Sequence, residues 1–272
     1  MPSPVVLLHS SLASGGQWRT LAARLGERPY RVFAPDLIGY GTAAPWSGEG
    51  RFQLHHEARA IHALLDGFGE PAHLIGHSYG GAVALEVARR RSDLRTLTLI
   101  EPVAFHLLRD GDVEDTLALA EIRRVAQRLA QALATGDYAV ACGEFVDYWS
   151  GRGTWAAMGA AKRAGAAARA AKVALDFHAT LEHAARLGDL EELALPTLLM
   201  HGERTTAPAR RICEHLARVL PDAREHVISG AGHMAPLTHA DEVNEFIVRH
   251  LEAGPTRRIT HPERSPSWIP QS

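Results

Sequence analysis

The segment Gly76–Gly81, with the sequence GHSYGG, constrains the fold of this chain more than any other feature. It follows the apolar run 72–75 and begins the helix-like stretch 82–88, so Ser78 stands between a strand and a helix. Such a tight turn accommodates only glycine beside the serine and lifts its hydroxyl above the edge of the sheet. The amino end of the following helix favours negative charge at the serine. The segment predicts an α/β fold and a nucleophilic serine, with an incidental serine in a glycine-rich turn as the alternative.

Six short apolar or β-branched runs recur along the chain, with helix-like stretches between them. Several of the runs lack polar alternation, as expected of parallel strands that are covered on both faces. We predict an α/β fold with a doubly wound, mostly parallel sheet of about six strands, whose chemistry gathers beyond the carboxyl ends of the strands. The predicted strands are 5–8, 31–34, 72–75, 97–100, 197–200 and 225–228. The predicted helices of the core are 18–25, 54–68, 82–91, 209–219 and 241–251.

The alternation of strands and helices is interrupted between about residues 105 and 193, a stretch rich in alanine with apolar residues at helical spacing. We expect several helices there, one of them around 156–171, and no strand. A helical insertion after a central strand is most simply a lid over the mouth of an active site. Its aromatic side chains either line a substrate pocket or pack the lid against the sheet. These aromatic residues are Phe145, Tyr148, Trp149, Trp155 and Phe177.

These boundaries divide the chain into a core of residues 1–104 and 194–253, a lid of residues 105–193 and a C-terminal tail of residues 254–272. The tail is rich in proline and polar residues, so we expect irregular structure. Trp268 and Ile269 would allow it to lie as an arm on a second copy of the chain, which leaves a homodimer open.

Composition narrows the range of partners. The 272 residues include 29 basic and 31 acidic residues, a net charge of −2, which gives no electrostatic reason to expect nucleic acid or a membrane surface as a partner. Cys142 and Cys213 make no disulfide framework, and no signal peptide precedes the first predicted strand, so we expect a cytoplasmic protein. Metal-binding spacings and a phosphate-loop lysine are not found, and we expect no metal and no organic cofactor.

A serine nucleophile needs a base, and His233 is the strongest candidate among 16 histidines. It stands in a glycine-flanked loop, 229–236, directly after the last predicted strand and before a terminal helix. In serine sites of this strand–turn–helix type the histidine follows the serine in the chain, as it does here. An unrelated histidine in the loop is the alternative.

These motifs resemble those of the α/β-hydrolase superfamily, over nearly the whole chain except the tail. The segment 35–41, with the sequence PDLIGYG, is similar to the family's loop after its fourth strand, where Asp36 is expected to hold the loop in place. The first predicted strand corresponds to the family's third, which implies that the opening hairpin is missing. The resemblance implies an oxyanion hole made by the backbone N–H groups of Tyr79 and Ser11.

Ser10, in the loop after the first predicted strand, stands where the family usually has glycine. Ordinary turn chemistry is the alternative for Ser10 and for Ser11. The candidate substrate-pocket residues are Ser10, Tyr148, Trp149 and Trp155.

The acid that should orient His233 is not where the family commonly places it. Thr205 occupies that position, and a threonine cannot stabilise an imidazolium. Glu101, which directly follows a fully apolar predicted strand, resembles the relocated acid carried after the sixth strand by a subset of haloalkane dehalogenases. We predict Glu101 as the acid. Two alternatives stay open, namely Glu203 as the acid and Glu101 as a structural residue beside Pro102.

The resemblance therefore implies a serine hydrolase that cleaves a carboxylic ester or related small acyl substrate through an acyl-enzyme on Ser78. The same triad also serves carbon–carbon bond hydrolases, lactonases, acyltransferases and cofactor-free peroxidases. A member that binds a small ligand without catalysis is an alternative of a different class. Thr205 in the acid's position favours it, whereas the intact Ser78 and His233 argue against it.

Overall fold

The protein, described here by a computed structural model over residues 2–254, is built on one parallel sheet of six strands in the order β2-β1-β3-β4-β5-β6. The predicted α/β class and the predicted number of strands are confirmed. The predicted tail beyond Gly254 and the arm with Trp268 and Ile269 lie outside the described residues. The strands are β1 (Ser3–Leu8), β2 (Tyr30–Phe33), β3 (Ala72–His77), β4 (Leu94–Ile100), β5 (Thr197–Gly202) and β6 (Ala223–Ile228).

Helices cover both faces of the sheet because successive strand residues point to opposite faces and both sets are apolar. Val6 and Leu8 of β1 belong to the hydrophobic layer under α2 (Leu54–Asp66), α3 (Tyr79–Ala88) and α9 (Ala207–Val219). Val5 and Leu7 belong to the opposite layer, under α1 (Arg19–Gly26) and α11 (Ala240–Ala253). Two short helices, η1 (Gly15–Trp18) and α10 (Ala235–Thr238), precede α1 and α11.

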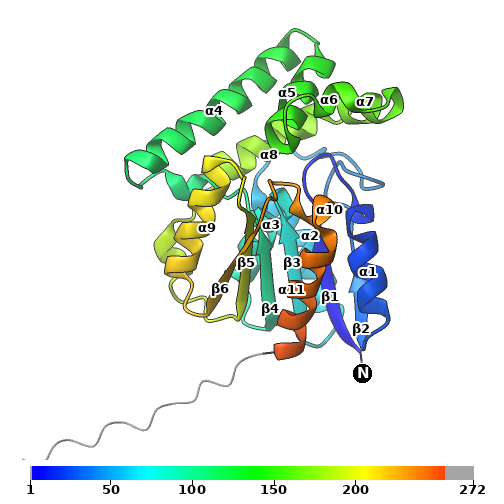
Figure 1. Ribbon diagram of the computed structural model, residues 1–272, viewed down its shortest axis with the longest axis vertical. Helices are drawn as coiled ribbons and strands as arrows, with labels where there is room; N and C mark the ends of the chain where they lie inside the picture. The colour runs from blue at the N-terminus through cyan, green and yellow to red at the C-terminus, as the bar shows by residue number, and fades with distance from the viewer. Residues whose placement is uncertain (1, 255–272) are drawn as a thin grey trace, which may run out of the picture.

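The segment between β4 and β5 is helical and contains no strand, as predicted. Its helices lie across the carboxyl ends of the strands, so this helical layer faces the end of the sheet where Ser78 stands (Figure 1). The helices of the layer are α4 (Val113–Ala134), α5 (Tyr138–Ser150), α6 (Thr154–Ala157), α7 (Ala160–Ala167) and α8 (Ala170–Leu181). The short helices η2 (Phe105–Leu108) and η3 (Leu187–Leu190) connect the layer to the core.

The prediction of one helix around 156–171 is wrong, because the chain breaks there into α6, α7 and the start of α8. Met158 and Gly159 adopt extended backbone angles, with ψ of 138° and 150°. A second break follows α7, where Arg169 leaves the helical region. Alanine favours helix everywhere in this stretch, but intrinsic propensity is a weak force that tertiary packing overrides.

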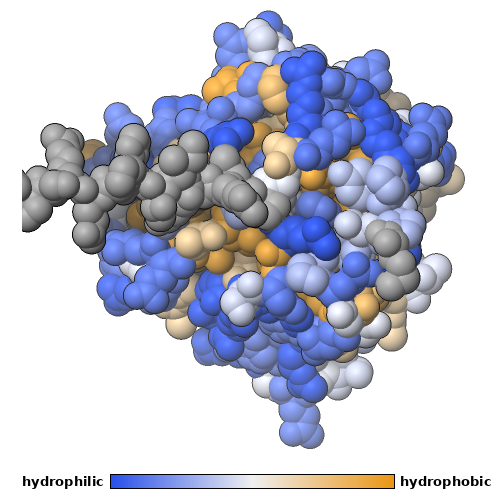
Figure 2. Space-filling view, turned by 90° about the horizontal axis from the view of Figure 1, so that it is seen from below, coloured by the Kyte–Doolittle hydropathy of each residue, from blue (hydrophilic) through white to orange (hydrophobic). Residues whose placement is uncertain are grey.

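The face of the molecule opposite the helical layer is covered mainly by hydrophilic residues, with smaller hydrophobic areas between them (Figure 2). No helix among the described residues is long and apolar enough to cross a membrane.

Candidate active site

Ser78 occupies a strained turn between β3 and α3. Its φ of 56° lies in the left-handed region, which non-glycine residues adopt only when the surroundings enforce it. The turn is tight on both sides: a Cβ on Gly76 would lie 2.3 Å from the Gly80 carbonyl oxygen, and one on Gly80 would lie 2.4 Å from that of Leu8. Both glycines are therefore required by close backbone approach, and the turn has the form of a nucleophile elbow.

The His233 imidazole lies between the serine and a carboxylate. Its Nε2 is 2.9 Å from Ser78 Oγ, and its Nδ1 is 2.6 Å from Glu101 Oε2. Because an ionised carboxylate can only accept, Nδ1–H donates to Glu101 and leaves the Nε2 lone pair to accept from the serine hydroxyl. All three side chains are buried, and Trp149 of α5 packs against the imidazole with 4.0 Å between ring centroids and 36° between the ring planes.

Glu101 directly follows β4, the neighbour of β3, and its φ of 44° turns the side chain toward His233. The carboxylate also accepts from the Gly202 backbone N–H at 2.8 Å and from the Thr205 hydroxyl at 2.5 Å. Burial by itself would raise the pKa of Glu101, but the charge of His233 and these hydrogen bonds together lower that pKa below its ordinary value. Glu101 is therefore held ionised beside the histidine.

Glu203, the other candidate acid, is directed elsewhere. Its carboxylate accepts from the Gly230 backbone N–H at 2.7 Å and from the Ser229 hydroxyl at 3.2 Å, at an exposed position. These bonds tie the loop that precedes His233, and they lower the pKa of the Glu203 carboxyl. Of the two acids, only Glu101 contacts the imidazole among the described residues.

Ser11 and Tyr79 line the same cavity as Ser78, and the backbone N–H of neither has an acceptor among the hydrogen bonds of residues 2–254. Tyr79 is the first residue of α3, where a helix has free donors. Ser10 is arranged differently, because its N–H and its hydroxyl both donate to Gln17 Oε1, at 3.1 and 2.8 Å. The predicted pair of oxyanion donors is thus available, while Ser10 is engaged in holding the loop.

A hydrogen-bonded chain links this loop to the histidine. Gln17 also donates to His77 Nδ1 at 3.1 Å, and His77 Nε2–H donates to the His233 backbone carbonyl at 2.9 Å. Burial, with the nearby His233, lowers the pKa of His77 to about 3, so its ring stays neutral and keeps both roles. Asp36 likewise ties its loop, accepting from the backbone N–H groups of Gly15 at 2.8 Å and Thr42 at 2.7 Å.

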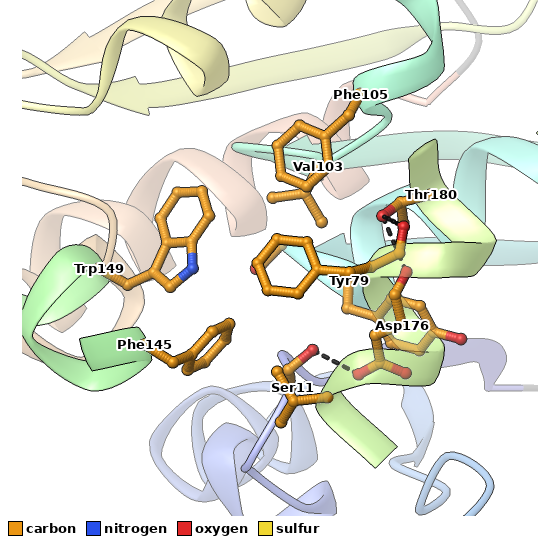
Figure 3. A pocket seen from close by; sticks show the side chains of 11 residues that line it. Ser11, Tyr79, Val103, Phe105, Phe145, Trp149, Asp176 and Thr180 are labelled. Atoms are coloured by element: carbon orange, nitrogen blue, oxygen red, sulfur yellow. Dashed lines mark hydrogen bonds between the residues drawn. The ribbon is translucent and has the colours of Figure 1, made fainter. Parts of the chain in front are cut away.

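A small, largely apolar cavity opens above Ser78, with about 260 Å³ of empty space (Figure 3). The aromatic side chains of Phe145 and Trp149, from α5, face Asp176 and Thr180, from α8, across it. The residues that line the cavity are Ser11, Ser78, Tyr79, Val103, Phe105, Phe145, Trp149, Val173, Asp176, Phe177 and Thr180.

Of the candidate pocket residues, Trp149 lines this cavity, and Ser10, Tyr148 and Trp155 do not. Those three side chains make other contacts. Tyr148 donates its hydroxyl to Glu121 at 2.7 Å, Trp155 packs against Gly143, and Ser10 is bonded to Gln17. Tyr148 and Trp149 are adjacent on a helix and so point in different directions.

Sequence reasoning missed a buried ionic cluster behind the cavity. Lys172 of α8 binds Glu57 Oε1 of α2 at 3.1 Å and also bonds to Asp176, one turn further along α8. Asp176 Oδ2 accepts from the hydroxyls of Tyr40, at 2.5 Å, and Ser11, at 2.6 Å. Burial raises the pKa of Glu57, although Lys172 opposes the shift. The only sequence signal is the i, i+4 spacing of Lys172, Asp176 and Thr180, which an ordinary exposed helix face would share.

No group of three or more histidine, cysteine, aspartate or glutamate side chains within residues 2–254 is arranged to hold a metal ion. Cys142 and Cys213 are both buried, and burial raises the pKa of each thiol, that of Cys142 to about 11.

The sequence model of the alpha/beta hydrolase family matches residues 5–246. Lipase LipV of Mycobacterium tuberculosis is 38% identical over 122 residues, which span 43% of this chain and 44% of the lipase. The pimeloyl-[acyl-carrier protein] methyl ester esterase of Methylococcus capsulatus is 28% identical, over 89% of this chain and 94% of the esterase. The magnesium-chelatase 30 kDa subunit of Rhodobacter capsulatus is also 28% identical, over 91% of this chain and 86% of the subunit.

Solved structures agree on the fold. MenH from S. aureus superimposes with a TM-score of 0.74 at 19% identity, covering 93% of this chain and 94% of MenH. An esterase from Exiguobacterium antarcticum does so with a TM-score of 0.67 at 19% identity, covering 92% of both chains. The family model matches most of the sequence, and the solved structures share the fold. This chain therefore belongs to the alpha/beta hydrolase family.

Proposed function

We propose that this protein is a serine hydrolase that cleaves carboxylic esters through an acyl-enzyme on Ser78. The observation that carries the proposal is the line of hydrogen bonds from Ser78 Oγ to His233 Nε2, 2.9 Å, and from His233 Nδ1 to Glu101 Oε2, 2.6 Å. Nucleophile, base and orienting acid in this order are what acyl transfer to a serine requires.

In the first half-reaction Ser78 Oγ attacks the acyl carbon while its proton passes to His233 Nε2. Glu101 stabilises the resulting imidazolium through the bond to Nδ1, and the ring of Trp149 adds a cation–π contact. The backbone N–H groups of Ser11 and Tyr79 bind the oxygen that becomes negative. His233 then gives its proton to the leaving alcohol, and the acyl group remains on the serine oxygen.

In the second half-reaction water repeats these steps. His233 takes a proton from the water, the water oxygen attacks the acyl-enzyme, and the proton returns to Ser78 Oγ as the carboxylic acid leaves. The cavity is small and mainly apolar, which favours a short acyl group. Relatives named as a lipase and a methyl ester esterase support ester cleavage as the reaction.

The test is covalent labelling with a fluorophosphonate, which traps an activated serine at its Oγ. We expect one equivalent of label on the wild-type protein and none on Ser78→Ala. Ser229→Ala is the matched control, since Ser229 is an exposed serine that donates to Glu203 away from the cavity, and it should label as the wild type does. Label that persists in Ser78→Ala, or a wild-type protein that is not labelled, contradicts the proposal.

A further inference from the structure

The cavity beside Ser78 has one polar corner, formed by Ser11, Asp176 and Thr180. The rest of the wall is aromatic or aliphatic apart from the serine nucleophile. Asp176 is 4% exposed, so its carboxylate is almost entirely removed from solvent. A buried charge at the wall of an apolar pocket is costly unless it is paired, and Asp176 is paired with Lys172.

The hydroxyl hydrogens of this corner already donate to acceptors of the protein itself. Ser11 Oγ donates to Asp176 Oδ2 at 2.6 Å, and Thr180 Oγ1 donates to the Asp176 backbone carbonyl at 2.8 Å (Figure 3). Tyr40, on the far side, donates to the same carboxylate oxygen as Ser11. The two hydroxyl groups and the carboxylate therefore offer only lone pairs to a bound substrate. The corner can accept a hydrogen bond and cannot donate one.

The charges around the cavity also disfavour an anionic group in the substrate. Lys172 is the cation of the cluster, and it is shared by two carboxylates, those of Asp176 and Glu57. All three side chains are buried. Among the described residues that line the cavity, none is lysine, arginine or histidine. An anionic group in the cavity would thus meet a carboxylate and no facing cation, which is unfavourable at low dielectric.

We propose that this corner selects acyl groups that carry a hydrogen-bond donor, such as a hydroxyl, on the second or third carbon, and excludes acyl groups that carry a carboxylate. This inference rests on the proposed function, in which the acyl carbonyl oxygen binds the Ser11 backbone N–H. Because the Ser11 Oγ is three bonds from the backbone nitrogen and Ser11 lines the cavity, this binding mode places the Oγ near the carbons next to the carbonyl. Asp176 and Ser11 are thereby specificity-determining residues.

Four methyl esters with four-carbon acyl groups test the selection: butyrate, 2-hydroxybutyrate, 3-hydroxybutyrate and the monomethyl ester of succinate. Turnover is followed by acid release, and kcat/KM is normalised to the fraction of protein that fluorophosphonate labels. We expect the better hydroxy ester to exceed butyrate by about tenfold or more, the effect of one hydrogen bond to a charge-linked acceptor. Monomethyl succinate should fall below butyrate by at least about tenfold.

Two variants locate the effect. Asp176→Asn replaces the carboxylate by an amide that can donate, and Ser11→Ala removes the hydroxyl while keeping the backbone N–H. In each, the ratio between hydroxy ester and butyrate should fall to about threefold or less, and in Asp176→Asn the discrimination against monomethyl succinate should relax. Glu182→Gln, an exposed acid at the end of α8, is the matched control and should keep the wild-type ratios.

The outcomes separate the two claims. A labelled protein that hydrolyses butyrate and the hydroxy esters equally, or that prefers monomethyl succinate, overturns the selection and leaves the serine hydrolase standing. Ratios that are unchanged in both Asp176→Asn and Ser11→Ala overturn the role of the corner. A protein that is neither labelled nor active on any ester contradicts the proposed function, and the selection is overturned with it.

Discussion

Thr205 stands where the family commonly carries the acid of its triad, and its hydroxyl donates to Glu101 at 2.5 Å. The residue in the usual acid's position therefore contacts Glu101, the carboxylate that lies beside His233. The hydroxyl is one of the groups that keep the pKa of Glu101 below its ordinary value. Thr205 thus remains part of the site: it contributes a hydrogen bond to Glu101, where the family commonly has a charged side chain.

Thr205→Val removes this hydrogen bond and nearly preserves the volume of the side chain. We expect the pKa of Glu101 to rise, because the ionised carboxylate loses one of its hydrogen bonds. This shift moves the acid limb of kcat/KM to higher pH, and ester hydrolysis at neutral pH should fall by roughly three- to tenfold. The pH profile of kcat/KM measures this shift, and Thr205→Ser, which keeps the hydroxyl, is the control. An acid limb that does not move in Thr205→Val would argue against a role for the hydrogen bond from Thr205 to Glu101.

The residue scale is also where sequence reasoning was least complete. Ser78 and His233 stand in glycine-flanked turns that reveal themselves locally, whereas a residue's place on a cavity depends on how its helix is rotated. Phe145 and Trp149, one turn apart on α5, both face the cavity, while Tyr148 turns its hydroxyl to Glu121. All three are aromatic residues in the same predicted helix, and without the packing of α5 the sequence does not separate them.

Two elements from different parts of the fold meet at Asp115. It lies in the first turn of α4, is fully buried, and accepts from Arg211 Nε of α9 at 2.7 Å and from His215 at 2.8 Å. Burial opposes ionisation, but these partners lower the pKa of Asp115 from 3.8 to about 2. The helical layer is therefore joined to the core here by a carboxylate that the fold keeps charged.

Asp115→Asn should lower the free energy of unfolding by about 2 kcal/mol at pH 7. Because the pKa in the folded state is depressed, the carboxylate stabilises the fold above about pH 4, and its contribution is lost as the pH falls toward 2. The difference between variant and wild type should therefore shrink below pH 4. Urea unfolding at several pH values measures it, with the exposed Asp110→Asn as a nearly neutral control. A difference that does not depend on pH would contradict the assignment.

At the scale of the whole molecule, Lys172 joins the helical layer to the core. It lies on α8, binds Glu57 of α2, and its ammonium is 4.8 Å from the ring centre of Tyr40 and 4.5 Å from that of Tyr79. Tyr79 is also the residue that follows Ser78. The position of the helical layer is thus coupled, through one buried cation, to the elbow and to the wall of the cavity.

Lys172→Met keeps the length of the stem and removes the charge, which leaves two buried carboxylates without their cation. We expect a loss of about 3 kcal/mol in the free energy of unfolding and faster hydrogen exchange in α8. Lys162, the other lysine of the chain, is exposed on α7. The control variant Lys162→Met should therefore have a free energy of unfolding close to that of the wild type. Equal stability of the two variants would show that the cluster does not hold the layer.

Sequence reasoning was most successful for the whole molecule. Apolar runs of strand length separated by helical stretches were enough for the order of elements and for the place of the insertion, because each depends on local pattern and on the rules of parallel sheets. The breaks at Gly159 and Arg169 were not predicted, because alanine favours helix on both sides of each. The ionic cluster around Lys172 was not predictable, since the bond from Lys172 to Glu57 joins segments far apart in the sequence. Glu101 was predicted because its place after an apolar strand resembles that of the relocated acid in a subset of haloalkane dehalogenases, and its carboxylate lies beside His233.

The central claim is that Glu101 serves as the acid of a relocated triad. Its most direct test is kcat on a short p-nitrophenyl ester for Glu101→Gln, with Glu203→Gln as the matched control and the fraction of folded protein checked by thermal unfolding. We predict a loss of roughly a thousandfold or more for Glu101→Gln, because the amide cannot stabilise the imidazolium, and a rate within about twofold of wild type for Glu203→Gln. Loss of turnover in Glu203→Gln alone would contradict the claim.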